Sequence, residues 1–226
     1  MTSKDDLIDA ALNHALFDGW SDAAIEAARQ DVGISAAEAK AMFPRGAVDL
    51  ALAYHRRGDA QMVEALKAED LSSMRFRDRI ALGVQIRLEV ADKELVRRGM
   101  SLFALPQYAP DGARALWETA DHIWTTLGDT SRDINWYTKR ASLSAVYSAT
   151  ALYWLGDESP GNEATWAFLD RRIENVMQYE QLKAKVRKNP LYETFMKGPG
   201  RVFDNVRAPG EPREGYPGHW HREGDE

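Results

Sequence analysis

The sequence predicts an all-α protein, and three observations support this fold class. Apolar residues recur at intervals of three and four along most of the chain, which is the period of a helix that buries one face. The alternation of apolar and polar residues that marks a half-buried strand is scarce. Glycine and proline stand mostly between the periodic stretches rather than inside them. The sequence therefore favours a bundle of helices over a fold with a sheet.

Three short helices are expected first, in the layout of a helix-turn-helix head over residues 1–46. Residues 5–17 carry an apolar stripe, and Gly19 follows as a cap. A second helix comes next. Ser35 begins the third, with Glu38 three residues later, which is the pattern of a capping box.

Longer helices are expected in a bundle over residues 47–186. They are placed at residues 47–68, 72–91, 113–127, 134–155 and 163–186. Met100–Tyr108, between Gly99 and Pro106, is expected to be a loose segment rich in large apolar residues.

The charge of the head disfavours a nucleic-acid partner. The first 59 residues hold six basic and ten acidic side chains, and the whole chain has a net charge of −6. The expected recognition helix, Ser35–Ala41, offers one lysine, one glutamate and four alanines, which gives little with which to contact bases or phosphates. The head is therefore interpreted as a scaffold that does not bind DNA.

Catalytic and metal-binding motifs are not found. The sequence has no cysteine, and its five histidines do not form the repeated Glu-x-x-His pattern of a di-iron bundle. Phosphate-loop, dinucleotide-binding and Gly-x-Ser-x-Gly motifs are absent as well. No apolar run is long enough to span a membrane, and the N-terminus is polar. We expect a non-enzymatic cytoplasmic protein without a metal or cofactor.

The most distinctive stretch is Asn135–Arg140, at the start of the most apolar expected helix. Trp136, Arg140 and Tyr147 are spaced four and seven residues apart and share one face. Tryptophan, tyrosine and arginine dominate interface hot spots, so one interpretation is a protein-binding surface. The other is that the aromatic residues are core and Arg140 pairs with a nearby carboxylate.

Several motifs in the same order resemble one known family. They are Leu12–Ile25, Met42–Phe43, Leu102–Pro106, Asn135–Arg140, Tyr147–Leu155 and Trp166–Leu169. Over roughly residues 5–180 the sequence is similar to the coenzyme Q (ubiquinone) biosynthesis accessory family, whose bacterial members are called rpsU-divergently transcribed proteins.

The resemblance implies a TetR-like fold, in which the bundle binds an apolar ligand and forms a homodimer. It implies that the ligand is an isoprenoid quinone precursor or a phospholipid, and that the protein works without catalysis at the inner membrane, as a peripheral protein. The implied partner is the demethoxyubiquinone hydroxylase or an equivalent quinone hydroxylase. The partner-binding residues that carry over are Trp136, Tyr137 and Arg140, with Ile123 a looser match.

Large apolar residues of three segments are the candidate walls of a lipid cavity. They are Ile80, Val84, Leu88, Leu102, Phe103, Leu105, Leu143, Val146, Tyr147 and Leu152. Small residues thin one side of the expected helix 134–155, which suits a cavity wall. Tight packing between helices is the alternative, because small residues serve that purpose too.

The last part of the chain changes character after residue 186. The candidate membrane-contacting residues of the amphipathic segment 187–207 are Leu191, Phe195, Val202 and Phe203. Pro199 interrupts this segment at a cost of about 3 kcal/mol to a continuous helix, so a flexible tail is the alternative. Residues 208–226 are expected to be disordered.

Two hypotheses follow. The first is a lipid-binding accessory protein of ubiquinone biosynthesis that presents quinone intermediates to a hydroxylase. The second is a TetR-like transcriptional regulator with a lipid ligand, against which the acidic head argues.

Overall fold

The computed structural model describes residues 3–187 and 206–209 of the chain. These residues form helices and no strands. The elements are α1 (Lys4–Asp18), α2 (Asp22–Asp31), α3 (Ala36–Met42), α4 (Ala47–Ala68), α5 (Phe76–Glu89), α6 (Lys93–Phe103), α7 (Ala109–Thr126), α8 (Ile134–Leu155), the short 3-10 turn η1 (Pro160–Asn162) and α9 (Glu163–Arg187). The expected all-α class is confirmed. No helix among the described residues combines the length and the apolar character needed to cross a bilayer.

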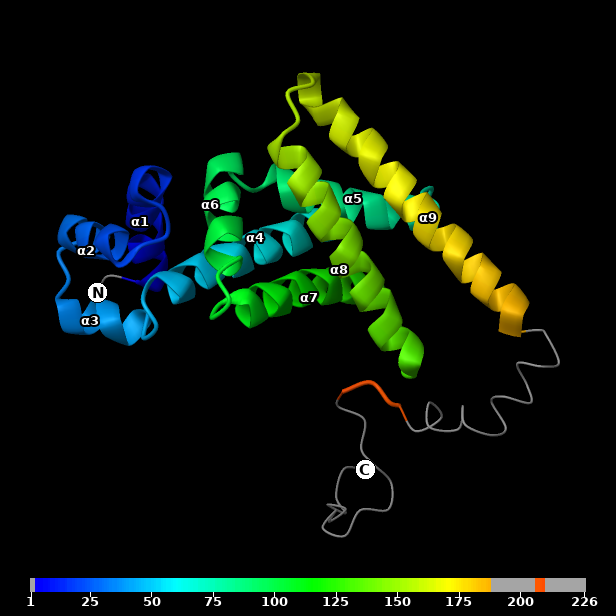
Figure 1. The fold of residues 1–226 in the computed structure, drawn as a ribbon, viewed down its shortest axis with the longest axis horizontal. Helices are drawn as coiled ribbons and strands as arrows, with labels where there is room; N and C mark the ends of the chain where they lie inside the picture. Colours follow the sequence, from blue (N-terminus) through cyan, green and yellow to red (C-terminus); the bar gives the residue numbers. More distant parts are fainter. Residues whose placement is uncertain (1–2, 188–205, 210–226) are drawn as a thin grey trace, which may run out of the picture.

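The head forms at one end of the molecule from α1, α2 and α3 (Figure 1). Ser3, Ser21 and Ser35 cap the three helices with their side chains, and the capping box expected between Ser35 and Glu38 is confirmed. Gly19 ends α1 at a φ of 69°, a conformation that glycine adopts without a steric penalty. These local signals set the helix boundaries of the head.

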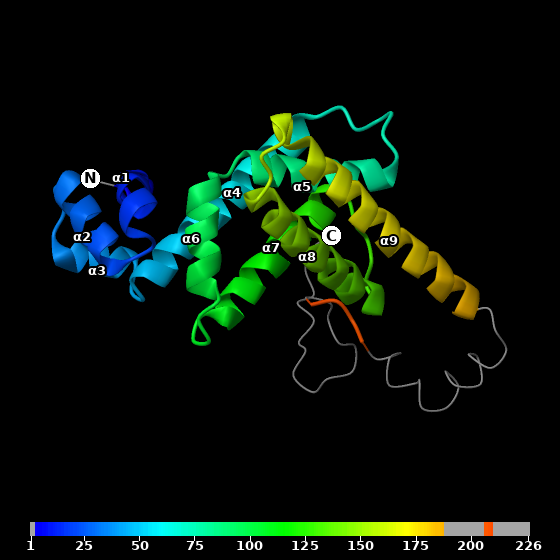
Figure 2. The ribbon, with the colours of Figure 1, turned by 45° about the horizontal axis from the view of Figure 1, so that its top comes forward.

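The body is built around α4, which runs out of the head and packs against α5 and α7. Helix α8 lies against α7 and α9, and α9 is the helix farthest from the head (Figures 1 and 2). One core cluster fills the body, with Leu66, Val84, Ile123, Leu143 and Ile173 among its buried members. A second cluster fills the head and reaches Leu95 of α6.

The prediction of a loose segment at Met100–Tyr108 is wrong for its first part, because Met100–Phe103 belong to helix α6. The Asp92 side chain accepts hydrogen bonds from the main-chain nitrogens of Glu94 and Leu95, which starts the helix. Gly99 does not end it. A Cβ on Gly99 would lie 3.5 Å from Nε1 of Trp20, so this glycine marks the close contact of α6 with the head. Long-range packing therefore outweighs the local preference of glycine.

Candidate functional site

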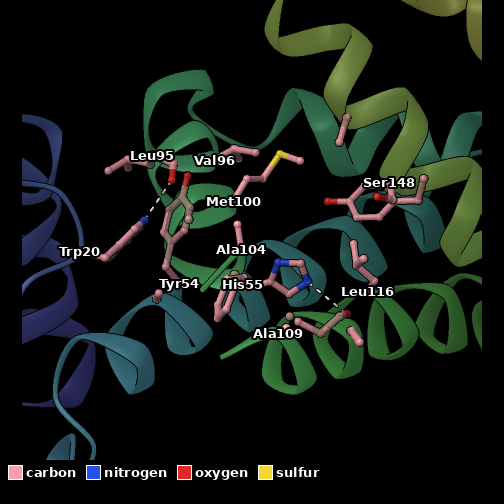
Figure 3. Close-up of a pocket in the computed structure, with 18 of the residues that line it drawn as sticks. Trp20, Tyr54, His55, Leu95, Val96, Met100, Ala104, Ala109, Leu116 and Ser148 are labelled. Atoms are coloured by element: carbon pink, nitrogen blue, oxygen red, sulfur yellow. Dashed lines mark hydrogen bonds between the residues drawn. The ribbon is translucent and has the colours of Figure 1, made fainter. Parts of the chain in front are cut away.

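A cavity of about 360 Å³ lies between α4, α6, α7 and α8 (Figure 3). Its apolar lining includes Val96, Met100, Phe103, Ala104, Leu116 and Ala151. Trp20 reaches it from the head and donates a hydrogen bond to the carbonyl of Leu95 at 3.0 Å. The cavity therefore has the size and chemistry of a small-molecule or lipid site.

Small residues create this space. Gly112 sits so close to α6 that a Cβ on it would lie 2.7 Å from Cβ of Phe103. On α8, Ser148 and Ala151 line the cavity, so part of the thin side of this helix faces it. The cavity is therefore bounded by the close approach of α6 and α7 at Gly112 and by small side chains of α8.

Two of the ten candidate lipid-binding residues, Phe103 and Tyr147, line this cavity. The other eight lie elsewhere. Five of these are buried in the body core, namely Ile80, Val84, Leu88, Leu143 and Val146. Leu102 is half-buried against the head core, and Leu105 and Leu152 are 43% and 58% exposed. Large apolar side chains fill the helix contacts, and the cavity opens where side chains are small.

A polar end of the cavity was missed by sequence reasoning. Arg87 lines it and is 2% exposed, and its Nε donates a hydrogen bond to Oδ1 of buried Asp59 at 2.6 Å. Gly58 makes room, since a Cβ there would lie 2.8 Å from Cζ of Arg87. One signal in the sequence could have indicated it. Arg87 follows Val84 by three residues and so lies on the helix face that is expected to be apolar and buried.

His55 is held next to this pair in one tautomer. Its Nδ1 accepts a hydrogen bond from Nη2 of Arg87 at 3.3 Å, so Nε2 carries the hydrogen and donates to Oγ1 of Thr119 at 2.8 Å. Thr119 in turn donates to Asp59 at 2.8 Å. Burial lowers the pKa of His55 to about 4, which keeps the imidazole neutral at pH 7. Within the described residues no three His, Asp or Glu side chains converge to bind a metal ion.

A separate aromatic cluster lies where α8 begins beside α7. The ring centroids of Trp136 and Tyr137 are 4.8 Å apart, and Trp117 of α7 lies 5.7 Å from Trp136. Trp136 and Tyr137 are half-buried. Ile123 is fully buried against Gly83 and offers no surface to a partner.

Arg140 is buried beneath this cluster and packs against the Trp136 ring. It is 2% exposed, and its Nη1 donates to Oδ2 of Asp129 at 3.0 Å while its Nε donates to Asp121 at 2.5 Å. Its guanidinium carbon lies 3.9 Å from the ring centroid of Trp136. Burial on its own would raise the pKa of Asp129, but hydrogen bonds from Lys139, Ser131 and Arg140 outweigh it and hold the pKa at about 2. Arg140 thus pairs with carboxylates and positions the Trp136 ring.

The short segment 206–209 lies beside the start of α8 (Figure 1). The hydroxyl of Tyr137 donates to the carbonyl oxygen of Arg207 at 3.1 Å, and the main-chain nitrogen of Ala208 donates to the carbonyl of Arg132 at 3.0 Å. The candidate membrane-contacting residues lie outside the described residues; they are Leu191, Phe195, Val202 and Phe203.

Comparison with known proteins finds a family that is similar to α7, α8 and most of α9. Residues 109–180 match COQ9. Over these residues the chain is therefore similar to the COQ9 family. The resemblance noted from the sequence motifs is thereby confirmed.

Curated COQ9 proteins extend the similarity to most of the chain. The chain is 31% identical over 207 residues to the mitochondrial ubiquinone biosynthesis protein COQ9 of Drosophila melanogaster, covering 89% of this chain and 63% of that protein. It is 32% identical over 180 residues to the human protein of the same name, with shares of 76% and 56%. The chain thus spans about three fifths of the length of these relatives.

A solved structure supports the TetR-like fold. A TetR transcriptional regulator from Nitrosomonas europaea superposes with a TM-score of 0.58 at 17% identity, covering 76% of this chain and 95% of that one. At this identity the similarity concerns the fold alone.

The COQ9 segment contains the aromatic cluster and the α7 and α8 walls of the cavity. The polar end of the cavity is lined by His55 and Arg87, with Asp59 buried behind Arg87. All three residues come before residue 109 and lie outside that match.

Proposed function

We propose that the protein is a non-catalytic accessory factor of ubiquinone biosynthesis that binds an isoprenoid quinone precursor and presents it to the quinone-ring hydroxylase. The observation that carries this proposal is the apolar cavity of about 360 Å³ in a TetR-like body. Its relatives are named ubiquinone biosynthesis proteins, which supports the pathway. The polyisoprenoid tail would exceed this volume, so the cavity would hold the ring and the first part of the tail.

Catalysis is assigned to the partner in this proposal. The one histidine at the cavity, His55, has both ring nitrogens engaged by Arg87 and Thr119. A base held in this way is poorly placed to exchange protons with a ligand. The protein would instead supply delivery and orientation, which lower a barrier without chemistry of their own.

Docking of the hydroxylase is proposed at Trp136 and Tyr137, with Arg140 as a positioning residue beneath them. Two half-buried aromatic side chains, one of which packs on a guanidinium, have the composition of an interface anchor. We further propose a homodimer through the outer faces of α8 and α9, where Leu152 and Met177 are exposed. The complex would work in the cytoplasm, at the surface of the inner membrane.

Native mass spectrometry of the purified protein tests lipid binding, followed by extraction and identification of the ligand. We expect about one lipid per subunit. Ser148→Trp fills the cavity from α8 and should abolish the bound mass. The matched variant Ala145→Trp adds the same ring at an exposed position of the same helix and should retain it. Equal lipid content in both variants would rule out the cavity as the site.

The docking surface is tested by replacing Trp136 and Tyr137 together with alanine. The variant should lose capture of the demethoxyubiquinone hydroxylase in a pull-down and keep its helical circular dichroism. Capture at the level of the unmodified protein would disprove this docking assignment.

A further inference from the structure

The polar end of the cavity contains donors that the described residues leave without acceptors. The hydrogen bonds that Arg87 makes to described residues use Nε and Nη2, which leaves Nη1 without an acceptor among the described side chains and main chain. The Tyr147 hydroxyl likewise has no hydrogen-bond partner among the described residues, although the residue is only 4% exposed and lines the cavity. Both residues line the cavity, and Cζ of Arg87 lies 6.0 Å from the Tyr147 ring centroid.

Stability alone gives little reason for an ion pair here. A buried arginine and carboxylate contribute weakly compared with apolar residues of the same volume, because both must give up their hydration. Moreover, Oδ2 of Asp59 is buried without a hydrogen bond in the structure, and unsatisfied groups of this kind cost about 1–3 kcal/mol each. The pair therefore favours a ligand role at the point where Arg87 meets the cavity.

The charges at this end set the kind of ligand. Asp59 neutralises Arg87, and His55 is neutral because burial lowers its pKa to about 4. Burial also raises the pKa of Tyr147, so its hydroxyl keeps its proton and can donate. A phosphate or carboxylate would therefore bring an uncompensated charge into a buried site, which is costly. An uncharged acceptor oxygen would not.

We propose that Arg87 Nη1 and the Tyr147 hydroxyl bind the acceptor oxygens of an uncharged lipid head, such as the carbonyl oxygens of a quinone ring. The proposal rests on the proposed lipid-binding function and adds the orientation of the ligand. The oxygen-bearing ring would lie between α5 and α8, which carry Arg87 and Tyr147. The tail would follow the apolar walls that include Met100, Phe103 and Leu116, of which Met100 and Leu116 are labelled in Figure 3.

Two probes with the same tail separate head recognition from burial of the tail. Decylubiquinone carries ring oxygens, and decylbenzene carries none. Affinities are measured by calorimetric titration of the full-length protein. We expect decylubiquinone to bind at least tenfold more tightly than decylbenzene, and more tightly than decanoate, whose charge the site does not compensate.

Tyr147→Phe removes only the hydroxyl and leaves the packing of the ring. It should lower the affinity for decylubiquinone by about threefold to tenfold, which is the range for one hydrogen bond, and leave the affinity for decylbenzene unchanged. Tyr153→Phe, a half-exposed tyrosine on the same helix outside the cavity, should change neither affinity. Arg87→Lys should also lower the affinity for decylubiquinone. Circular dichroism checks that this variant is folded.

The outcomes separate the two proposals. If neither probe binds, the lipid-binding function and this inference both fail. If both probes bind but Tyr147→Phe leaves them unchanged, or weakens them equally, head recognition is refuted while lipid binding stands. Tighter binding of decanoate than of decylubiquinone would overturn the preference for an uncharged head.

Discussion

The hydroxyl of Tyr137 donates a hydrogen bond to the main-chain carbonyl oxygen of Arg207, 3.1 Å away, although the two residues are 70 positions apart in the chain. The same segment makes a second hydrogen bond, which the main-chain nitrogen of Ala208 donates to the carbonyl oxygen of Arg132. The chain therefore places part of its own C-terminal region on the aromatic cluster that is proposed to receive the hydroxylase.

Removal of this segment should strengthen partner binding. A chain that ends at residue 205 loses both hydrogen bonds, whereas a chain that ends at residue 209 keeps them. We expect the shorter chain to bind the hydroxylase about fivefold to thirtyfold more tightly, because one or both of the hydrogen bonds must break on binding and each contributes about 1 kcal/mol. Surface plasmon resonance with immobilised hydroxylase compares the two. Equal affinities would show that the segment does not compete with the partner.

Arg140→Met should destabilise the protein strongly. The substitution leaves buried Asp129 without its Arg140 partner and removes the support under Trp136. Breaking a buried pair costs about 3–5 kcal/mol, which corresponds to a fall in melting temperature of roughly 10 °C for a domain of this size. The control is Arg56→Met, which breaks an exposed pair with Glu118 and should cost less than about 1 kcal/mol. Similar decreases in melting temperature for the two variants would contradict the structural role of Arg140.

His55 should make the protein less stable in mild acid. Its pKa falls from 6.5 to about 4 on folding because the ring is buried. Below pH 6.5 the unfolded chain therefore takes up a proton that the folded protein refuses, and the free energy of unfolding decreases as the pH falls towards 4. Between pH 7 and pH 5 this contribution is about 2 kcal/mol.

Urea denaturation at the two pH values measures this dependence. In His55→Gln the loss of stability between pH 7 and pH 5 should be smaller by that amount. His122→Gln, at an exposed histidine of α7, should behave like the unmodified protein. An unchanged pH dependence in His55→Gln would show that another group titrates in this range.

Gly112→Ala should destabilise the contact of α6 with α7. The new Cβ would lie 2.7 Å from Cβ of Phe103, a position close to the main chain that cannot move without shifting α6. Overpacking of this kind costs about 1–3 kcal/mol. Gly156→Ala, where the nearest atom is 3.8 Å away, is the matched control and should leave thermal stability unchanged or slightly raised. Equal stability of the two variants would mean that the helices are not closely packed at Gly112.

The sequence by itself determined the helices whose boundaries are set by nearby residues. Ser35 with Glu38 predicted the start of α3, and the apolar period predicted α4 and α8. These signals are local, because a capping side chain reaches only three residues and a helix repeats every 3.6 residues. Helix α6 was missed because Gly99 weakens the local signal, and its contact with Trp20 of the head became visible only in the structure.

Tertiary structure alone decided where the cavity lies. The sequence predicted that large apolar residues form the cavity walls, but residues such as Val84 and Leu143 fill the core instead. Gly112 is small where α6 and α7 are in close contact, whereas Ser148 is small where α8 faces the cavity. A sequence does not show whether a small residue faces a neighbouring helix or an empty space. Arg87 was likewise hidden, because its partner Asp59 lies 28 positions earlier and only the packing of α4 on α5 brings the two charges together.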